Sequence, residues 1–349
     1  MDVATITAVI PTYRRPAMLR RAIESVLGQT YPHIRVAVFD NASGDETASV
    51  VAELAARDSR VRYRCHPENL GAVRNFQAGM DAVDTDYFCL LSDDDLLLPG
   101  FFAHAMDRLR RQPGAGFFCG QTVRFNPDEG THEARPTRDW QDGFYEAGQA
   151  TFTMLRTMFT WTGVVFSTRI RELAGPFERI EICDLLFMGL AAARSPFVVS
   201  LVPCAVRTYW TGSALRHLTP DQIGRVYEVT AARLTGLASL PSGQADRIGS
   251  LLEAKLRRAL GTRLRNGFLA GDRQAVERAG RLLEMHGGLG PGQRVRLALA
   301  TSAGGDGLLL GGVRGLMRMQ QALRRRRRVP RHKATLEDVV RLYSASLPS

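Results

Sequence analysis

Three consecutive aspartates follow an apolar run in the segment LLSDDDLLLPG, residues 90–100. Asp93 and Asp95 are one residue apart, so in an extended chain their carboxylates point to the same side. Two close carboxylates either share a proton or bind a cation, and Mg²⁺ or Mn²⁺ suits such oxygen ligands. A simpler interpretation is that the acids favour the N-terminus of a helix that Pro99 opens. The triplet alone leaves both interpretations open, but the missing D-x-D-x-D-G loop excludes an EF-hand.

Other polar residues could bind a nucleotide. Asp40 and Asn41 close the strand-like run VAVFDNAS at residues 36–43. An acid there could accept hydrogen bonds from a base or ribose, although turn formation explains it equally well. Arg74 lies one turn into a predicted helix and could reach a diphosphate bidentately, or simply be solvated. The cluster RTYWTGS, residues 207–213, is by itself most simply a strand end with aromatic packing.

Two common nucleotide-binding classes are excluded by their missing motifs. No G-x-G-x-x-G follows the first predicted strand, and no G-x-x-x-x-G-K-[ST] occurs in the chain. A Rossmann dehydrogenase and a P-loop NTPase both depend on these glycine-rich loops to hold phosphate.

Strand and helix patterns alternate over the first 125 residues and would position these groups. Apolar runs predict strands at 6–13, 36–43, 61–66, 87–95 and 115–125, and helical spacing predicts helices at 16–29, 47–58, 71–83 and 99–111. This alternation predicts an α/β fold with a mostly parallel central sheet and helices on both faces. Because ligands bind at the carboxyl ends of such strands, Thr12, Tyr13, Asp40, Asn41 and residues 93–95 should share one edge.

The remainder of the chain divides into three stretches. Residues 126–160 are rich in loop-forming residues, and residues 161–213 return to mixed structure. From about residue 220 the pattern is helical and rich in arginine. We therefore predict a domain over 1–215 and a helical C-terminal region over 216–349.

The charge of the chain is unevenly distributed. The net charge is +11, but residues 251–349 hold 20 basic and 7 acidic residues, so the first 250 residues carry a net −2. The basic character belongs to the C-terminal part, and we expect no nucleic-acid partner. Five scattered cysteines without a CxxC pair argue against disulfides and zinc. With no signal-peptide layout and no apolar span of about 20 residues, we expect a cytoplasmic protein.

The C-terminal region contains a candidate membrane-binding helix. In residues 307–328, Leu309, Val313, Leu316 and Leu323 lie among arginines, which indicates an interfacial amphipathic helix. The run Arg324–Arg328 would add attraction to anionic lipid, placing the protein peripherally on the inner face of the cell membrane. A solvated basic face or a partly disordered tail explains the same composition.

Four segments in order, VIPTYRRPAMLRRAIESVLGQTYP, VFDNASGDET, NLGAVRNFQAG and LLSDDDLLLPG, resemble the family 2 glycosyltransferases. These are inverting enzymes with the GT-A fold. The resemblance is specific over residues 5–125 and continues more faintly over 160–213. It implies a nucleotide-sugar-binding half at 1–125 and an acceptor half at 126–215.

The resemblance also implies roles for individual residues in the donor half. Asp95 would bind the metal, Mg²⁺ or Mn²⁺, with Asp93 as a second ligand. Donor-binding residues would be Pro11, Thr12, Tyr13, Arg14, Asp40, Asn41, Arg74, Asp93 and Asp94.

In the acceptor half the resemblance implies a general base and an acceptor surface. In GPFERIEICDLLFMGLAAAR the matching base is Asp184, with Glu181 as the alternative. Cys183 stands where the family usually has glutamate, and Trp210 where many relatives have a histidine near the metal. Trp161, Thr162 and Gly163, together with Trp210, would contact the acceptor.

The activity implied is that of an inverting, metal-dependent, hexosyltransferase-type enzyme. It would move a sugar from a UDP- or dTDP-type donor to a hydroxyl of a saccharide, lipid-linked or small-molecule acceptor. Such products belong to polysaccharide, glycolipid or glycosylated natural-product biosynthesis. A sugar-1-phosphate nucleotidyltransferase is disfavoured because PTYRRP is not its glycine-rich loop. The alternative is a non-catalytic GT-A-like module that binds nucleotide sugar or membrane.

Overall fold

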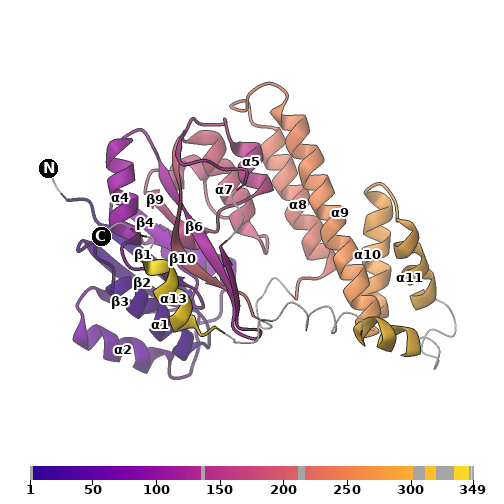
Figure 1. The fold of residues 1–349 in the computed structure, drawn as a ribbon, viewed down its shortest axis with the longest axis horizontal. Coiled ribbons are helices and arrows are strands. Elements are labelled where there is room, and N and C mark those ends of the chain that lie inside the picture. The colour runs from indigo at the N-terminus through magenta and orange to yellow at the C-terminus, as the bar shows by residue number, and fades with distance from the viewer. Residues whose placement is uncertain are drawn as a thin grey trace.

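The computed structural model of the chain describes residues 3–134, 138–210, 217–301, 311–319, 334–345 and 347. Within these residues one sheet of ten strands forms the centre of the molecule (Figure 1). Its strands are β1 (Ile6–Thr12), β2 (Ile34–Asp40), β3 (Val61–Cys65), β4 (Tyr87–Leu90), β5 (Leu96–Leu97), β6 (Phe117–Asn126), β7 (Thr131–Ala134), β8 (Gly143–Tyr145), β9 (Val164–Ser167) and β10 (Phe197–Thr208).

The strands run in the order β3-β2-β1-β4-β9-β6-β10-β5, with β7 on β6 and β8 on β10. Strands β3, β2, β1 and β4 are parallel, and Thr12 pairs with Asp40 where β1 and β2 end. Strand β9 is antiparallel to both β4 and β6, while β6 and β10 are again parallel. The predicted α/β fold with a mostly parallel sheet is confirmed, and the first four strands end on one edge.

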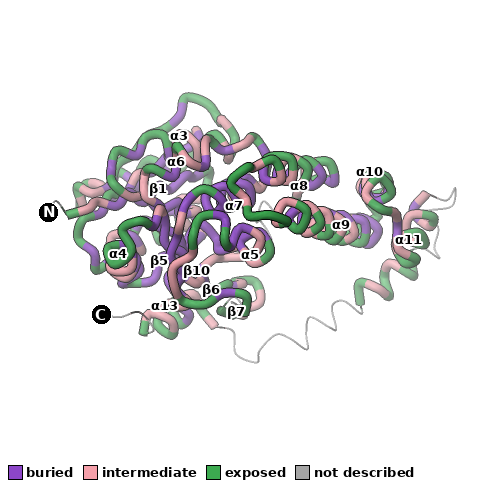
Figure 2. The backbone as a smooth tube through the Cα atoms, turned by 90° about the horizontal axis from the view of Figure 1, so that it is seen from above, coloured by how far each residue is buried: buried purple, intermediate pink, exposed green. Residues whose placement is uncertain are grey.

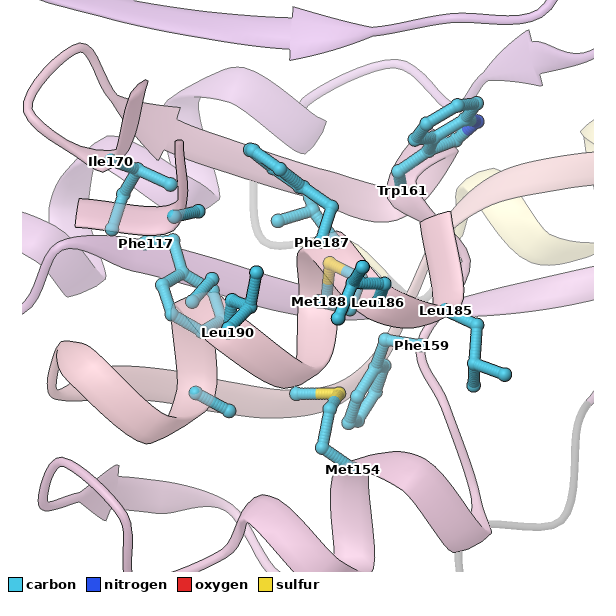
Figure 3. Close-up of a cluster of buried hydrophobic side chains, with 14 of the residues drawn as sticks. Phe117, Met154, Phe159, Trp161, Ile170, Leu185, Leu186, Phe187, Met188 and Leu190 are labelled. Atoms are coloured by element: carbon cyan, nitrogen blue, oxygen red, sulfur yellow. The ribbon is translucent and has the colours of Figure 1, made fainter. Parts of the chain in front are cut away.

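Helices cover both faces of this sheet. In the first 210 residues they are α1 (Pro16–Leu27), α2 (Thr47–Arg57), α3 (Ala72–Asp81), α4 (Phe101–Arg111), α5 (Thr151–Arg156), the 3₁₀ turn η1 (Trp161–Gly163), α6 (Ile170–Ala174) and α7 (Cys183–Arg194). One core packs α1, α2 and α4 against the sheet, and a second packs α3, α5, α6 and α7 on the other face. Figure 3 shows Phe187 and Leu190 of α7 among Phe117 and Met154. Apolar residues all round α7 are explained by its burial (Figure 2).

One local prediction is wrong. The fourth strand ends at Leu90 rather than at Asp95, and the short strand β5 separates the aspartates from α4. Residues 126–160 are rich in loop, as predicted, and they also contain β7, β8 and α5. Strand β7 forms a hairpin with β6, whereas β8 pairs with β10, a distant partner that a local pattern does not reveal.

The C-terminal region is helical, as predicted. Its described helices are α8 (Pro220–Thr235), α9 (Gln244–Ala270), α10 (Arg273–Met285), α11 (Pro291–Thr301), a helix over 311–319 and α13 (Leu336–Ser344). Helix α8 contacts α7, and α9 contacts α5. Helix α13 returns to the sheet, where the fully buried Val339 packs with Leu98 and Val206 (Figure 1). No helix in these described segments is long and apolar enough to cross a membrane.

Candidate active site

A cavity of about 500 Å³ opens at the edge where β1, β2 and β4 end. Its walls come from the segments after β1, β2 and β4, from the start of α3 and from the end of β10. They are Pro11, Thr12, Tyr13, Arg15, Asn41, Asn69, Gly71, Ala72, Asn75, Phe76, Ser92, Asp93, Asp94, Asp95, Arg207, Thr208 and Tyr209. The rule for parallel strands therefore brings together Thr12, Tyr13, Asn41 and the aspartate triplet.

The side chain of Asp93 is buried, with 5% of its residue surface exposed, and two donors, one at the end of β1 and one just before α1, hold it. Thr12 Oγ1 donates to Asp93 Oδ2 at 2.8 Å. Arg15 Nη1 donates to Asp93 Oδ1 at 3.0 Å and lies 3.5 Å from Asp94 Oδ2. One guanidinium thus offsets the repulsion between two neighbouring carboxylates.

Asp94 and Asp95 are held by residues from the second half of the domain. Trp210 Nε1 donates to Asp94 Oδ2 at 3.1 Å. Thr162 Oγ1 donates to Asp95 Oδ2 at 2.6 Å, and the backbone N–H of Thr208 donates to Asp95 Oδ1 at 2.9 Å. The triplet therefore joins the end of β1 and the start of α1 to η1 and β10.

The triplet does not cap α4. That helix begins at Phe101 after Gly100, whose φ is 83°, and it has no side-chain cap and no acid in its first turn. The partners of the three carboxylates are instead threonine, arginine and tryptophan side chains around the cavity. The helix-terminus interpretation of the aspartates is wrong.

The two buried carboxylates are electrostatically costly when ionised. Burial raises the pKa of Asp93 to about 6, against the opposing effect of Arg15. Burial, with a further contribution from the Asp94 charge, also raises the pKa of Asp95. A bound divalent cation would offset this cost, because it stabilises the ionised form of both groups.

In metal-free protein, Asp93→Asn is expected to stabilise the fold near pH 8 but not near pH 4. Because the pKa of Asp93 is raised in the folded protein, neutral Asp93 stabilises the fold below the ordinary pKa of 3.8. This contribution to the free energy of unfolding is lost as the pH rises through about 6. The difference between the two pKa values corresponds to about 3 kcal/mol of stability, which the variant with a neutral asparagine would keep at high pH. Urea unfolding in EDTA at both pH values measures the gain, and excess Mn²⁺ should reduce it near pH 8. A gain equal at both pH values would contradict the explanation.

Asp40 is buried and engaged by its own loop. Its Oδ1 accepts from the Ser43 N–H at 3.0 Å, and its Oδ2 accepts from Tyr63 Oη at 2.6 Å. Asp40 does not line the cavity, whereas its neighbour Asn41 does. Asn41 Nδ2 donates to Asn69 Oδ1 at 2.8 Å, which ties this loop to the one before α3.

The loops after β1 and β2 contain the two described non-glycine residues with positive φ. Arg14 has φ 55° and Ala42 has φ 59°. Arg14 N–H donates to Ser43 Oγ at 2.9 Å and its Nε to Ser43 O at 3.1 Å, so it joins the two loops instead of lining the cavity. Strained backbone of this kind concentrates at functional sites.

Helix α3 presents two different faces near the cavity. Asn75 is buried, and its Nδ2 donates to Phe39 O at 2.9 Å while its Oδ1 faces His66 Nε2 at 3.0 Å. Arg74 is exposed in the first turn of α3, beside the lining residues Gly71 and Ala72 but not itself lining the cavity.

The 3₁₀ turn η1 forms a buried platform behind the triplet. The ring centroids of Trp161 and Phe76 lie 4.6 Å apart, and Phe76 lines the cavity. Thr162 holds Asp95, as described above. A Cβ on Gly163 would lie 2.8 Å from Gly120 O, so only glycine fits between η1 and β6. The Arg15 guanidinium lies over the Trp210 ring, and its Cζ is 5.5 Å from the ring centroid.

Asp184 lies in the first turn of α7, half-buried and outside the cavity lining. Its Oδ1 accepts from the Leu185 N–H at 3.0 Å. Its charge contributes to a raised pKa of Tyr227, so it lies near α8. Glu181 is exposed, and Cys183 is buried in the core.

Sequence reasoning missed several residues that line the cavity. Arg15 pairs with Asp93, whereas the prediction named Arg14. Asn69 and Asn75 were also missed. Tyr209, and Arg207, whose charge opposes the raised pKa of Asp95, were noted only as part of RTYWTGS. The signal for Arg15 was the doubled arginine in PTYRRP, and choosing between the two required the backbone of the loop.

A model of the family described as "Glycosyl transferase family 2" matches residues 7–172, which include β1, the triplet and η1. The chain contains a family 2 glycosyltransferase domain. Among curated relatives, this family 2 domain is 31% identical over 104 residues to the GalNAc(5)-diNAcBac-PP-undecaprenol beta-1,3-glucosyltransferase of Campylobacter jejuni. That alignment covers 30% of this chain and 34% of the relative, so the chain spans about a third of that protein.

Solved structures share the GT-A fold of this chain at low sequence identity. Staphylococcus aureus TarS 1–349, in complex with UDP-GlcNAc, has a TM-score of 0.60 at 16% identity, covering 85% of this chain and 89% of that one. The mannosyltransferase PcManGT of Pyrobaculum calidifontis, in complex with GDP-Man and Mn²⁺, has a TM-score of 0.51 at 15% identity and covers 99% and 86% of the two chains. The predicted family and fold are confirmed.

Proposed function

We propose that this chain is an inverting glycosyltransferase that takes a sugar from a UDP- or dTDP-type donor to an acceptor hydroxyl. The observation that carries the proposal is the cavity at the ends of β1, β2 and β4 with three aspartates on one wall. The family 2 match supports it, as does the nucleotide sugar bound by TarS. The catalytic domain would be 1–215, with donor and acceptor halves at 1–125 and 126–215 and a helical region at 216–349.

The donor would lie along the edge of the sheet. Its base and ribose would contact Pro11, Thr12, Tyr13 and Asn41, with Asp40 fixing the loop through Ser43. Arg14 would hold the same loop from the β1 side, and Arg74 would reach from the rim of α3 to the diphosphate. Asp93 and Asp94 would complete the ribose and diphosphate site, with Arg15 bound to both carboxylates.

The carboxylates suit a hard divalent cation, Mg²⁺ or Mn²⁺. Such ions often use only one or two carboxylates plus phosphate oxygens of the substrate. Among the described residues no group of three or more His, Cys, Asp or Glu side chains could hold a metal ion, so the diphosphate would have to supply further ligands. Asp95 would hold the ion with Asp93. A bound ion supplies positive charge where the diphosphate leaves. PcManGT, the structural neighbour above, binds Mn²⁺.

The acceptor would enter on the side of η1 and β10. Trp161, Thr162 and Gly163 form the platform, Trp210 lies beside Asp94, and Asp184 would take the proton from the attacking hydroxyl. Saccharide, lipid-linked and small-molecule acceptors fit this scheme. The acceptor class named for the Campylobacter relative, a diphosphate-linked undecaprenol, favours a lipid-linked one.

A panel of nucleotide sugars, incubated with and without Mn²⁺, tests the function through release of nucleoside diphosphate. We expect one UDP- or dTDP-sugar to be turned over faster with Mn²⁺. A chain that binds nucleotide sugar but never releases diphosphate, even with candidate acceptors, would instead be a non-catalytic module.

The C-terminal region is proposed to place the enzyme on an anionic membrane surface. In the helix over 311–319, Val313, Leu316 and Met319 are 45%, 55% and 56% exposed and recur every three residues. The run Arg324–Arg328 lies outside the described residues, as do Leu309 and Leu323.

Leu316→Glu/Met319→Glu is expected to reduce sedimentation with phosphatidylglycerol vesicles several-fold, because it removes apolar contact and adds negative charge. Point changes are preferable to deleting residues 307–349, since that deletion would also remove α13 from the sheet. Val295→Glu, at an exposed site on α11, is the matched control. Equal sedimentation of all three proteins would show that the 311–319 helix does not contribute to membrane binding.

A further inference from the structure

A second cavity, of about 930 Å³, lies between the family 2 domain and the helical region. Helix α9 forms one wall, and α8, the end of α5 and the residue before α7 form the other. Six cationic side chains line it: Arg156, Lys255, Arg258, Arg263, Arg265 and Arg318. No carboxylate is among its described lining residues, so its potential is strongly positive.

The cationic wall is a single face of α9. Lys255, Arg258, Thr262 and Asn266 recur at intervals of three or four residues, which places them on one side of the helix. Leu256, Leu260 and Leu264 on another side are buried in the C-terminal core. The core therefore fixes the direction in which the cations point.

One of these cations is partly removed from water. Arg263 is half-buried, and burial lowers the pKa of its guanidinium. Desolvating a guanidinium carries a free-energy cost that an anion in the groove would offset. Arg156 is paired with Asp139 at 2.7 Å, and four of the six cations of the groove belong to α9.

The second cavity adjoins the donor cavity. Tyr209 lines both, and the Arg124 guanidinium lies 4.1 Å from its ring centroid. Ile182, two residues before Asp184, lines the second cavity, and so does Tyr227, whose pKa the Asp184 charge helps to raise. A ligand lying along α9 would thus end close to the proposed base.

We infer that this groove is an acceptor subsite that binds the phosphate groups of an anionic acceptor and directs its hydroxyl toward Asp184. The inference rests on the proposed function. Arginine forks match phosphate oxygens bidentately, and phosphate retains its charge at neutral pH. The apolar floor, with Ile182, Leu218, Ile223 and Leu269, leaves room for the sugar or lipid part of the same molecule.

The test is calorimetric titration of the full chain with inorganic tripolyphosphate in EDTA, where the metal-free aspartates disfavour phosphate in the donor cavity. Arg258→Ser/Arg265→Ser removes two exposed α9 guanidinium groups that no hydrogen bond or ion pair joins to another described residue. Two charge-assisted contacts correspond to at least about tenfold in affinity. Arg225→Ser/Arg281→Ser, exposed on α8 and α10 outside the groove, is the matched control.

We expect tripolyphosphate binding by the wild type and the control, and binding at least about tenfold weaker in the groove variant. Absence of wild-type binding, or an equal loss in the control, would overturn the inference. Vesicles bearing an isoprenyl diphosphate, compared with phosphatidylglycerol vesicles of equal charge, distinguish the source of the phosphate. Groove-dependent preference for the first identifies a lipid diphosphate, and tripolyphosphate binding without that preference identifies a phosphate-bearing acceptor that is not lipid-linked.

The outcome is separable from that of the donor proposal. Donor hydrolysis without acceptor should be equal in the groove variant and the wild type, because the two substituted residues lie outside the donor cavity. Loss of donor turnover in every protein would instead count against the proposed function, whatever the groove binds.

Discussion

Replacing Asp184 with asparagine is expected to lower transfer by about 10²–10⁴-fold, the usual contribution of a general base. Asparagine has nearly the same shape, and its amide oxygen can still accept from the Leu185 N–H. Because Asp184 does not line the donor cavity, the affinity for nucleoside diphosphate should be unchanged. The fall should therefore be in kcat, measured at saturating donor.

Glu181→Gln is the matched control for that variant. Glu181 is exposed and lies before α7, so its loss should leave turnover near that of the wild type. If Asp184→Asn retains full turnover and Glu181→Gln loses it, the alternative base is the correct one. If neither variant loses turnover, the base lies elsewhere and the assignment from the resemblance fails.

Replacing Asp95 with asparagine is expected to lower donor turnover by about 10²–10³-fold and to abolish most of its stimulation by Mn²⁺. The carboxylate is buried, and in asparagine the amide oxygen can still accept from the Thr208 N–H while the amide NH2 can donate to Thr162 Oγ1. The fold should therefore survive while the charge that would hold the cation is lost. The measurement is donor hydrolysis across a Mn²⁺ titration.

Asp107→Asn, on the outer side of α4, removes a carboxylate that forms only a surface pair with Arg111 among the described residues and should change neither rate nor metal response. Wild-type stimulation by Mn²⁺ in Asp95→Asn would show that Asp93 or Asp94 holds the ion. It would contradict the assignment of Asp95 as the principal metal ligand.

The sheet edge could be predicted because it depends on local pattern and one topological rule. Thr12, Asn41 and Asp93 each follow an apolar strand, and parallel strands bring their carboxyl ends together. The sequence could not predict that Arg15, and not Arg14, is the partner of Asp93. That choice depends on the positive φ at Arg14, which turns the Arg14 side chain toward Ser43. No sequence period encodes such a turn.

The groove on α9 was equally beyond sequence analysis. Lys255, Arg258 and Arg265 look like an ordinary solvated basic face, and only docking of α8 and α9 against α5 and α7 makes that face a cavity wall. The pairing of β8 with β10, and the return of α13 to the sheet, likewise join residues far apart in the chain. Local propensity carries no information about these contacts.

The cavity at the aspartate triplet is tested most directly by calorimetric titration of UDP, dTDP and GDP in the presence of Mn²⁺. Ala72→Glu places a carboxylate in the wall of the cavity, in the first turn of α3, where the helix dipole tolerates it. Ala48→Glu makes the same change in the first turn of α2, away from the cavity. We predict that the wild type and Ala48→Glu bind UDP or dTDP equally and that Ala72→Glu binds at least about tenfold more weakly. Equal binding by Ala72→Glu, or no binding of any of the three nucleotides by the wild type, would contradict the proposed donor site.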